Sequence, residues 1–157
     1  MVHFFQNAFW PNSYAWQIFF IAGLIPLIGL YIFNQNRASS ANRAFFMLCM
    51  AIFFWMTGQA VVLCSKTESL ALLIYRSTTF LGVSLIATLV YYFSVTWLGL
   101  ETTHKKRVQI AFLGSFFFYA MGLFTPWSFI KWKNFNWGYC PLYGPTNWFF
   151  QIGRAHV

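Results

Sequence analysis

The sequence predicts an all-α membrane protein, a bundle of four complete transmembrane helices followed by the start of a fifth. Hydrophobic residues make up 59% of the 157 residues and charged residues only 8%, whereas about a quarter of the residues in a soluble domain are usually charged. The apolar residues gather in blocks of about 20, the length that a helix needs to cross hydrocarbon. The blocks do not alternate with a period of two, which argues against a membrane barrel.

The spans can be placed because polar connections interrupt the apolar blocks. Neither acidic nor basic residues nor His occur in residues 14–33, 44–63, 77–98 and 108–130. Charged side chains are costly in hydrocarbon, so these stretches are the natural cores of membrane helices. The predicted helices cover residues 14–33, 44–63, 70–98 and 108–130, and a fifth begins at about residue 147.

Helix-capping signals refine these boundaries. Asn12 or Ser13 offers an N-cap for the first helix, and Pro26 inside that helix should kink it. The sequence SKTE at Ser65–Glu68 has the spacing of a capping box, which predicts that the third helix starts near Lys66.

Small and polar residues within the spans predict how the helices pack. Thr57 and Gln59 in the second span are expected to form hydrogen bonds between helices. Glycines allow helix backbones to approach closely in membranes. The glycines expected at such contacts are Gly58, Gly82, Gly114 and Gly122.

The orientation follows from the basic residues in the connections. One side of the membrane receives five of them, at Arg37, Arg43 and residues 105–107. The other side receives three or four, since Arg76 sits near its boundary and the remainder are lysines. The positive-inside rule therefore predicts that the first side is cytoplasmic and that the N-terminus lies outside. The basic residues do not form one patch, which argues against a nucleic-acid partner and leaves the lipid bilayer as the expected one.

The sequence contains no pattern typical of catalysis. Its two acidic residues, Glu68 and Glu101, lie in connections on opposite sides, which excludes a carboxylate pair. Its three histidines do not lie at ligand spacing from a Cys or a carboxylate, so neither a metal site nor a cofactor is expected. There is also no glycine-rich phosphate loop and no nucleophile elbow.

Two features near the predicted outer face leave alternatives open. Cys64 and Cys140 are both expected there, so they either form a disulfide or remain two unrelated thiols. Arg76 is either a ligand contact or anchor near the outer mouth of the bundle, or a side chain that snorkels to the membrane interface.

The loop at residues 131–150 combines aromatic side chains with glycine and proline. This composition is typical of an ordered turn or small hairpin rather than a flexible linker. We expect a hairpin over the outer ends of the helices, with one arm at Phe129 to Lys133 and the other at Trp137 to Cys140.

Three stretches carry a family resemblance: NRAFFMLCMAIFFWMTGQAVVL, ALLIYRSTTFLGVSLIATLVYYFSVTWL and NWGYCPLYGPTNWFF. Over Tyr14 to Phe150 the sequence resembles the N-terminal seven-helix sensor region of histidine kinases, which also precedes diguanylate cyclase modules. Trp55 within the second helix and Arg76 near the start of the third match that pattern, whereas Thr88 stands where many relatives have proline. The last motif, W-G-Y-x-P-x-x-G-P, is matched by Trp137, Gly138, Tyr139, Pro141, Gly144 and Pro145.

The resemblance implies a sensory input domain that passes a stimulus to a cytoplasmic output module. The motif residues and Arg76 would then form a ligand site with its lid, or the loop would be a purely structural cap. By family analogy the intact protein would be a homodimer that reaches a response regulator through the output module. A small transporter or channel subunit is the alternative, although it would predict a polar stripe or charges within the spans.

The last six residues match the translation of a sequencing adapter. Ile152 to Val157 can be encoded by ATC GGA AGA GCA CAC GTC, a string that matches a common short-read sequencing adapter. We therefore expect residues 1–150 to form a partial sensor domain and residues 151–157 to be adapter read-through that is not part of the fold. The alternative is a natural basic tail.

Overall fold

The computed structural model describes residues 9–125, 129–135 and 138–143. The predicted start of the fifth helix, the predicted read-through segment and Trp137, Gly144 and Pro145 lie outside these residues. The described elements are α2 (Ser13–Gln35), α3 (Ser40–Cys64), α4 (Glu68–Ile74), the π-helix η1 (Tyr75–Thr79), α5 (Phe80–Trp97), α6 (Glu101–Phe124), β1 (Phe129–Phe135) and β2 (Gly138–Tyr143).

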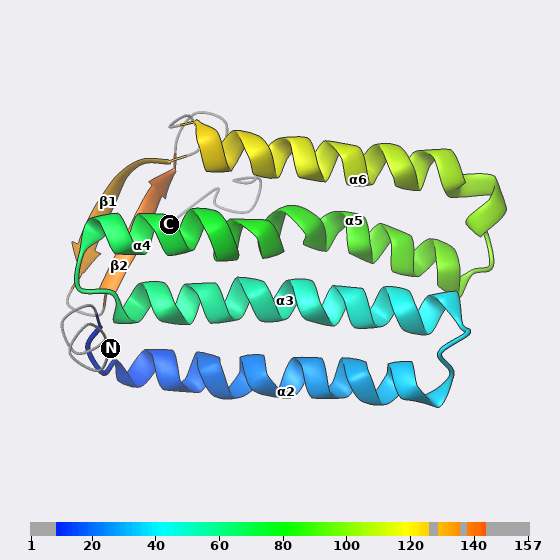
Figure 1. Ribbon diagram of the computed structural model, residues 1–157, viewed down its shortest axis with the longest axis horizontal. Coiled ribbons are helices and arrows are strands. Elements are labelled where there is room, and N and C mark those ends of the chain that lie inside the picture. The colour runs from blue at the N-terminus through cyan, green and yellow to red at the C-terminus, as the bar shows by residue number, and fades with distance from the viewer. Residues whose placement is uncertain (1–8, 126–128, 136–137, 144–157) are drawn as a thin grey trace, which may run out of the picture.

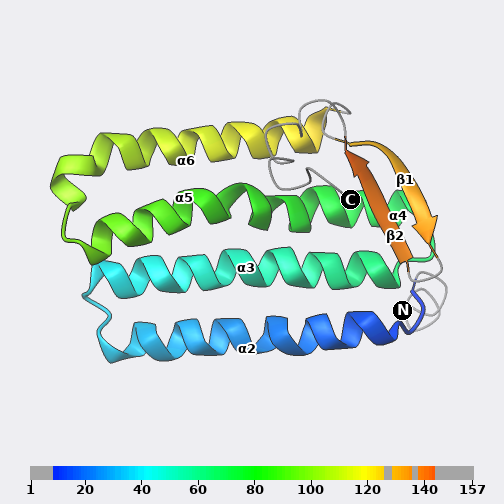
Figure 2. The same cartoon turned by 180° about the vertical axis from the view of Figure 1, so that it is seen from behind.

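The helices lie side by side in one row, in the order α2, α3, α5, α6, and neighbours run in opposite directions (Figures 1 and 2). The main contacts join α2 with α3, α3 with α5, and α5 with α6. The sequence predicts a bundle, whereas the described helices form an open row. Lipid tails are as apolar as the side chains, so a membrane helix need not bury its remaining faces against protein.

Among the described residues, four helices are long and apolar enough to cross a membrane: α2, α3, the continuous segment Glu68–Trp97, and α6. Much of their apolar surface faces outward, for example Phe20, which is 70% exposed, and Leu113, which is 76% exposed. Side chains of this kind would be unfavourable in water and are suited to lipid. The prediction of four spans is therefore confirmed.

The beginning of α2 agrees with the predicted cap. Asn12 is the N-cap, and its side chain accepts a hydrogen bond from the backbone N–H of Tyr14 at 3.0 Å. The Asn12 amide also donates to the carbonyl oxygen of Leu63 at 3.0 Å, which ties the start of α2 to the end of α3. Pro26 lies inside α2, which continues through it to Gln35.

The third membrane helix begins at Glu68, two residues after the start predicted from the capping signal at Lys66 and two before the predicted span of 70–98. Its N-cap is Thr67, whose hydroxyl accepts a hydrogen bond from the N–H of Leu70 at 3.4 Å. The capping box predicted at Ser65 is wrong because Ser65 is the C-cap of α3. The Ser65 hydroxyl donates to the carbonyl oxygen of Val61 at 3.0 Å, so it is already used by the preceding helix.

The fourth helix differs from its predicted span of 108–130 at both ends. It begins at Glu101, so the basic stretch before Val108 is helical. It ends at Phe124, and Thr125 is extended, with φ −117° and ψ 147°. Pro126 follows in the sequence, and a residue before proline disfavours helical geometry, which explains the early end.

Strands β1 and β2 pair antiparallel, with Trp132 opposite Pro141 and Phe135 opposite Gly138. The two arms predicted for this loop overlap these strands. The hairpin lies beside α4 and the end of α3 (Figures 1 and 2). We call this side of the row the hairpin end, and we call the side with the α2–α3 and α5–α6 connections the basic end.

Candidate functional site

The hairpin end contains an irregular helical turn that the sequence did not predict. Within the third membrane helix, η1 has π-helical geometry, and the N–H of Phe80 donates to the carbonyl oxygen of Tyr75, five residues back. Such turns are rare and are frequent at functional sites. The Ser77 hydroxyl donates to the carbonyl oxygen of Leu73 at 2.8 Å. A hydroxyl that competes for helix carbonyls in this way favours a local departure from α-geometry.

Neighbouring helices hold η1 from both sides. From α6, the Tyr119 hydroxyl donates to the carbonyl oxygen of Ser77 at 3.0 Å. From α3, Gly58 lies directly against Thr79, so that a side chain at position 58 would overlap it. Tyr75 is buried in a cluster with Val62, Ala71 and Phe80. The segment η1 therefore contacts α3 on one side and α6 on the other.

Arg76, which the sequence singled out, lies within η1 and is half-buried. Its Nε is buried and has no hydrogen-bond partner. The hydroxyls of Thr57 and Thr79 are also buried without a partner. The prediction of an interhelical hydrogen bond for Thr57 is therefore wrong. Among the described residues, α3 contributes one of these three unsatisfied polar atoms and η1 contributes two.

The hairpin packs against the end of α3. Gly138 is buried with φ 133°, and a Cβ there would lie 3.0 Å from the carbonyl oxygen of Leu63. Both the positive φ and the close approach require glycine. Tyr139 packs against the cluster that contains Tyr75, and its hydroxyl donates to the carbonyl oxygen of Lys66 at 3.3 Å. Two residues of the predicted lid therefore pack against the end of α3, the connection before the third helix and the cluster that contains Tyr75.

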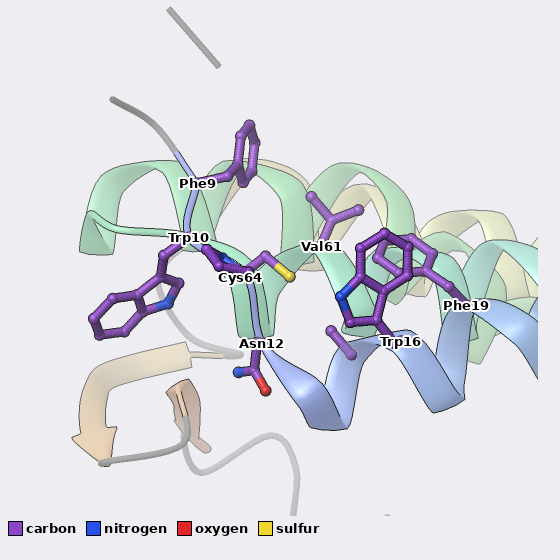
Figure 3. Close-up of a pocket in the computed structure, with 9 residues that line it drawn as sticks. Phe9, Trp10, Asn12, Trp16, Phe19, Val61 and Cys64 are labelled. Carbon is purple, nitrogen blue, oxygen red and sulfur yellow. The ribbon is translucent and has the colours of Figure 1, made fainter. Parts of the chain in front are cut away.

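A pocket of about 430 Å³ opens at the hairpin end between α2, α3 and the segment before α2 (Figure 3). The N–H of Trp10 donates to the carbonyl oxygen of Cys64 at 3.0 Å, which holds that segment against the end of α3. No sequence pattern predicts this pocket, because its walls come from three separate segments. The lining residues are Phe9, Trp10, Pro11, Asn12, Ala15, Trp16, Phe19, Val61 and Cys64.

With this geometry established, comparison with known proteins decides the family. A family model described as the N-terminal 7TM region of histidine kinase matches residues 17–152. The chain belongs to this family. The resemblance predicted from the sequence is confirmed, and the 7TM region of histidine kinases is a non-catalytic sensor region. No curated protein and no solved structure matches the chain significantly.

The site residues predicted for this 7TM region are only partly brought together. Gly138 lies against Leu63 at the end of α3, and Tyr139 packs against the cluster that contains Tyr75, the residue before Arg76 in the sequence. Pro141 lies in β2 opposite Trp132. Cys64 has a free thiol among the described residues, and the Cys140 side chain lies outside them, so the disulfide between the two stays a prediction.

At the basic end, the 7TM region has a second group of polar contacts. The Ser40 hydroxyl donates to the carboxylate of Glu101 and joins α3 to α6. The Tyr91 hydroxyl and Nδ1 of His104 share a hydrogen bond of 2.8 Å between α5 and α6. These contacts fix helix ends to one another. Among the described residues no group of three or more His, Cys, Asp or Glu side chains could hold a metal ion.

Proposed function

We propose that this chain is the membrane-embedded input domain of a two-component histidine kinase and passes a stimulus to a cytoplasmic output module. The observation that carries the proposal is the family match over residues 17–152. The four membrane-spanning helices support it, because they provide a route from one face of the bilayer to the other. The intact protein would act as a homodimer and reach a response regulator only through its output module.

Signal transfer needs an element with two arrangements of similar energy. We assign this role to η1. One residue of an α-helix corresponds to about 100° of rotation, so a π-turn that relaxes to α-geometry changes the rotation of α5 relative to α4. Because α5 lies between α3 and α6, such a rotation would change the packing of both neighbours.

The proposed orientation places the hairpin end outside the cell and the basic end in the cytoplasm, in accordance with the distribution of basic residues. Cysteine labelling tests this in a variant from which the natural cysteines are removed. Lys66→Cys should react with a membrane-impermeant maleimide on intact cells, and Lys105→Cys should react only after the cells are opened. The reverse pattern would refute the orientation.

The function itself is tested by sequencing the intact gene. We expect codons for further membrane spans, followed by a helix with a phospho-accepting His and an ATP-binding domain, or by a cyclase module. A downstream transporter half would contradict the proposal.

The role of η1 is tested in that intact kinase. Deletion of Thr78 should restore continuous α-geometry and fix autophosphorylation in membrane vesicles at one level, with no response to the stimulus. The control is Thr78→Ala, which keeps the chain length and should retain the response. If the deletion variant responds as the parent does, η1 is not the switching element.

A further inference from the structure

Arg76 lacks a counter-charge within this sequence. The chain has only two acidic residues, Glu68 and Glu101. Glu101 lies at the basic end, where it accepts the hydrogen bond from Ser40. Glu68 is exposed at the start of α4, eight residues before Arg76 and thus about 12 Å away along the helix axis. Neither carboxylate is placed to pair with the Arg76 guanidinium.

One atom of the half-buried Arg76 side chain distinguishes it from a side chain that snorkels freely into water. Snorkelling keeps the polar head hydrated while the aliphatic stem covers apolar surface. Here the Nε atom is buried and lacks a hydrogen-bond partner. A buried donor on a charged group is unfavourable unless it is paired, so the Nε–H of this guanidinium is suited to an acceptor that carries negative charge.

The depth of Arg76 fits a boundary site. Trp97, the last residue of α5, follows Arg76 by 21 residues, or about 30 Å along a helix. This equals the thickness of the hydrocarbon core. With Trp97 at the interface of the basic end, Arg76 lies at the opposite interface, where lipid headgroups and dissolved anions can both reach it.

From these observations we propose that Arg76 binds an anionic group, a carboxylate or a phosphate, at the hairpin-end boundary of the membrane. The guanidinium is planar and presents a fork of N–H donors that matches both kinds of anion. This names the ligand class for the sensory role and rests on the proposed function. Because Arg76 belongs to η1, an anion bound there would act directly on the π-turn.

The anion could come from solution or from a lipid, and two sets of measurements separate these sources. The 157-residue chain is purified in a neutral maltoside detergent. In the first set it is titrated with sodium phosphate or sodium acetate against sodium chloride at matched ionic strength. In the second set the micelles are doped with phosphatidylglycerol. Both sets record the melting temperature and the arginine side-chain 1H–15Nε resonances, and the Arg76 signal is identified by its loss in Arg76→Lys.

A saturable shift of the Arg76 Nε resonance and of the melting temperature is expected with one probe. Arg76→Lys keeps the positive charge but loses the fork, and Arg76→Gln loses both. In each variant the probe concentration that gives half of the melting-temperature shift should rise at least tenfold. The control is Arg107→Lys, because Arg107 is exposed at the basic end and should bind as the parent does. Far-UV circular dichroism of each variant confirms that its helices form.

Each outcome is decisive. A response to phosphate or acetate supports a dissolved ligand, and a response to phosphatidylglycerol alone supports a lipid headgroup. Absence of a response to every probe, or equal shifts of the melting temperature in the parent and in Arg76→Lys, overturns the proposal. These titrations require no kinase output, so failure here would leave the proposed function standing, and failure of the gene-sequence test would leave the anion site standing.

Discussion

Close packing of α3 against α5 depends on Gly82, and replacement of this residue by alanine tests the packing directly. A Cβ on Gly82 would lie 2.5 Å from the carbonyl oxygen of Ala51 and 2.5 Å from the backbone nitrogen of Trp55. Both atoms belong to the backbone of α3, so a change of side-chain rotamer cannot relieve the overlap. The two helices would have to move apart and lose contacts along their length.

The magnitude follows from a comparison with Gly114→Ala. The sequence predicts a close helix contact at Gly114 too, but a Cβ there meets nothing within 4 Å, so that prediction is wrong. Both substitutions gain up to about 1 kcal/mol of helix propensity, whereas only Gly82→Ala incurs the overpacking cost of about 1–3 kcal/mol. The free energy of unfolding of Gly82→Ala should therefore lie about 1–3 kcal/mol below that of Gly114→Ala.

The assay is reversible unfolding in mixed micelles of dodecyl maltoside and sodium dodecyl sulfate, followed by far-UV circular dichroism and tryptophan fluorescence. Gly114→Ala should unfold at the same or a higher fraction of sodium dodecyl sulfate than the parent. Equal unfolding free energies of the two variants would refute the packing of α3 on α5 described here.

Three further predictions use the same assay. The hydroxyls of Thr88 and Ser115 share a buried 2.6 Å hydrogen bond between α5 and α6, so a double-mutant cycle of Thr88→Val and Ser115→Ala should give a coupling of about 0.6 kcal/mol; a coupling of zero would show that the bond contributes nothing. Tyr119→Phe removes the 3.0 Å bond to the carbonyl oxygen of Ser77 and should cost about 1 kcal/mol, whereas an unchanged unfolding free energy would contradict this contact. Asn12→Ala removes the cap of α2 and should lower stability by about 1 kcal/mol, while Asn12→Ser, which keeps a capping oxygen, should lower it less.

The spans were predictable from sequence because the requirement for about 20 apolar residues is set by the bilayer. The cap at Asn12 was predictable because it depends only on neighbouring residues. The exact start of the third helix was not predictable from sequence, because Ser65 and Thr67 carry equivalent hydroxyls. Only the structure shows that the Ser65 hydroxyl is bonded within α3 and that Thr67 is the N-cap. The early end of the fourth helix has a local sequence signal, the proline after Thr125. The predicted span continued past this proline because it followed the length of the apolar run.

The candidate site was less predictable than the spans. Arg76 could be singled out from the sequence because it is a charged residue next to a long apolar run. Gly138 and Tyr139 could be singled out because they belong to the W-G-Y-x-P-x-x-G-P motif. The π-turn has no such signature, because it depends on which carbonyls the Ser77 hydroxyl and Tyr119 engage. The arrangement of the helices in one row was also not predictable, because the sequence of a membrane helix that is apolar on every side does not indicate which face packs against another helix.

The row has a consequence for how the chain folds during synthesis. Each helix finds its main partner in the next helix along the chain, so pairing can proceed as the spans enter the membrane one after another. Such local contacts favour rapid folding. The hydrogen bond from Tyr139 to the carbonyl oxygen of Lys66 spans 73 residues. That contact can form only after the third and fourth membrane helices are in place, so among the described segments the hairpin is the last to dock.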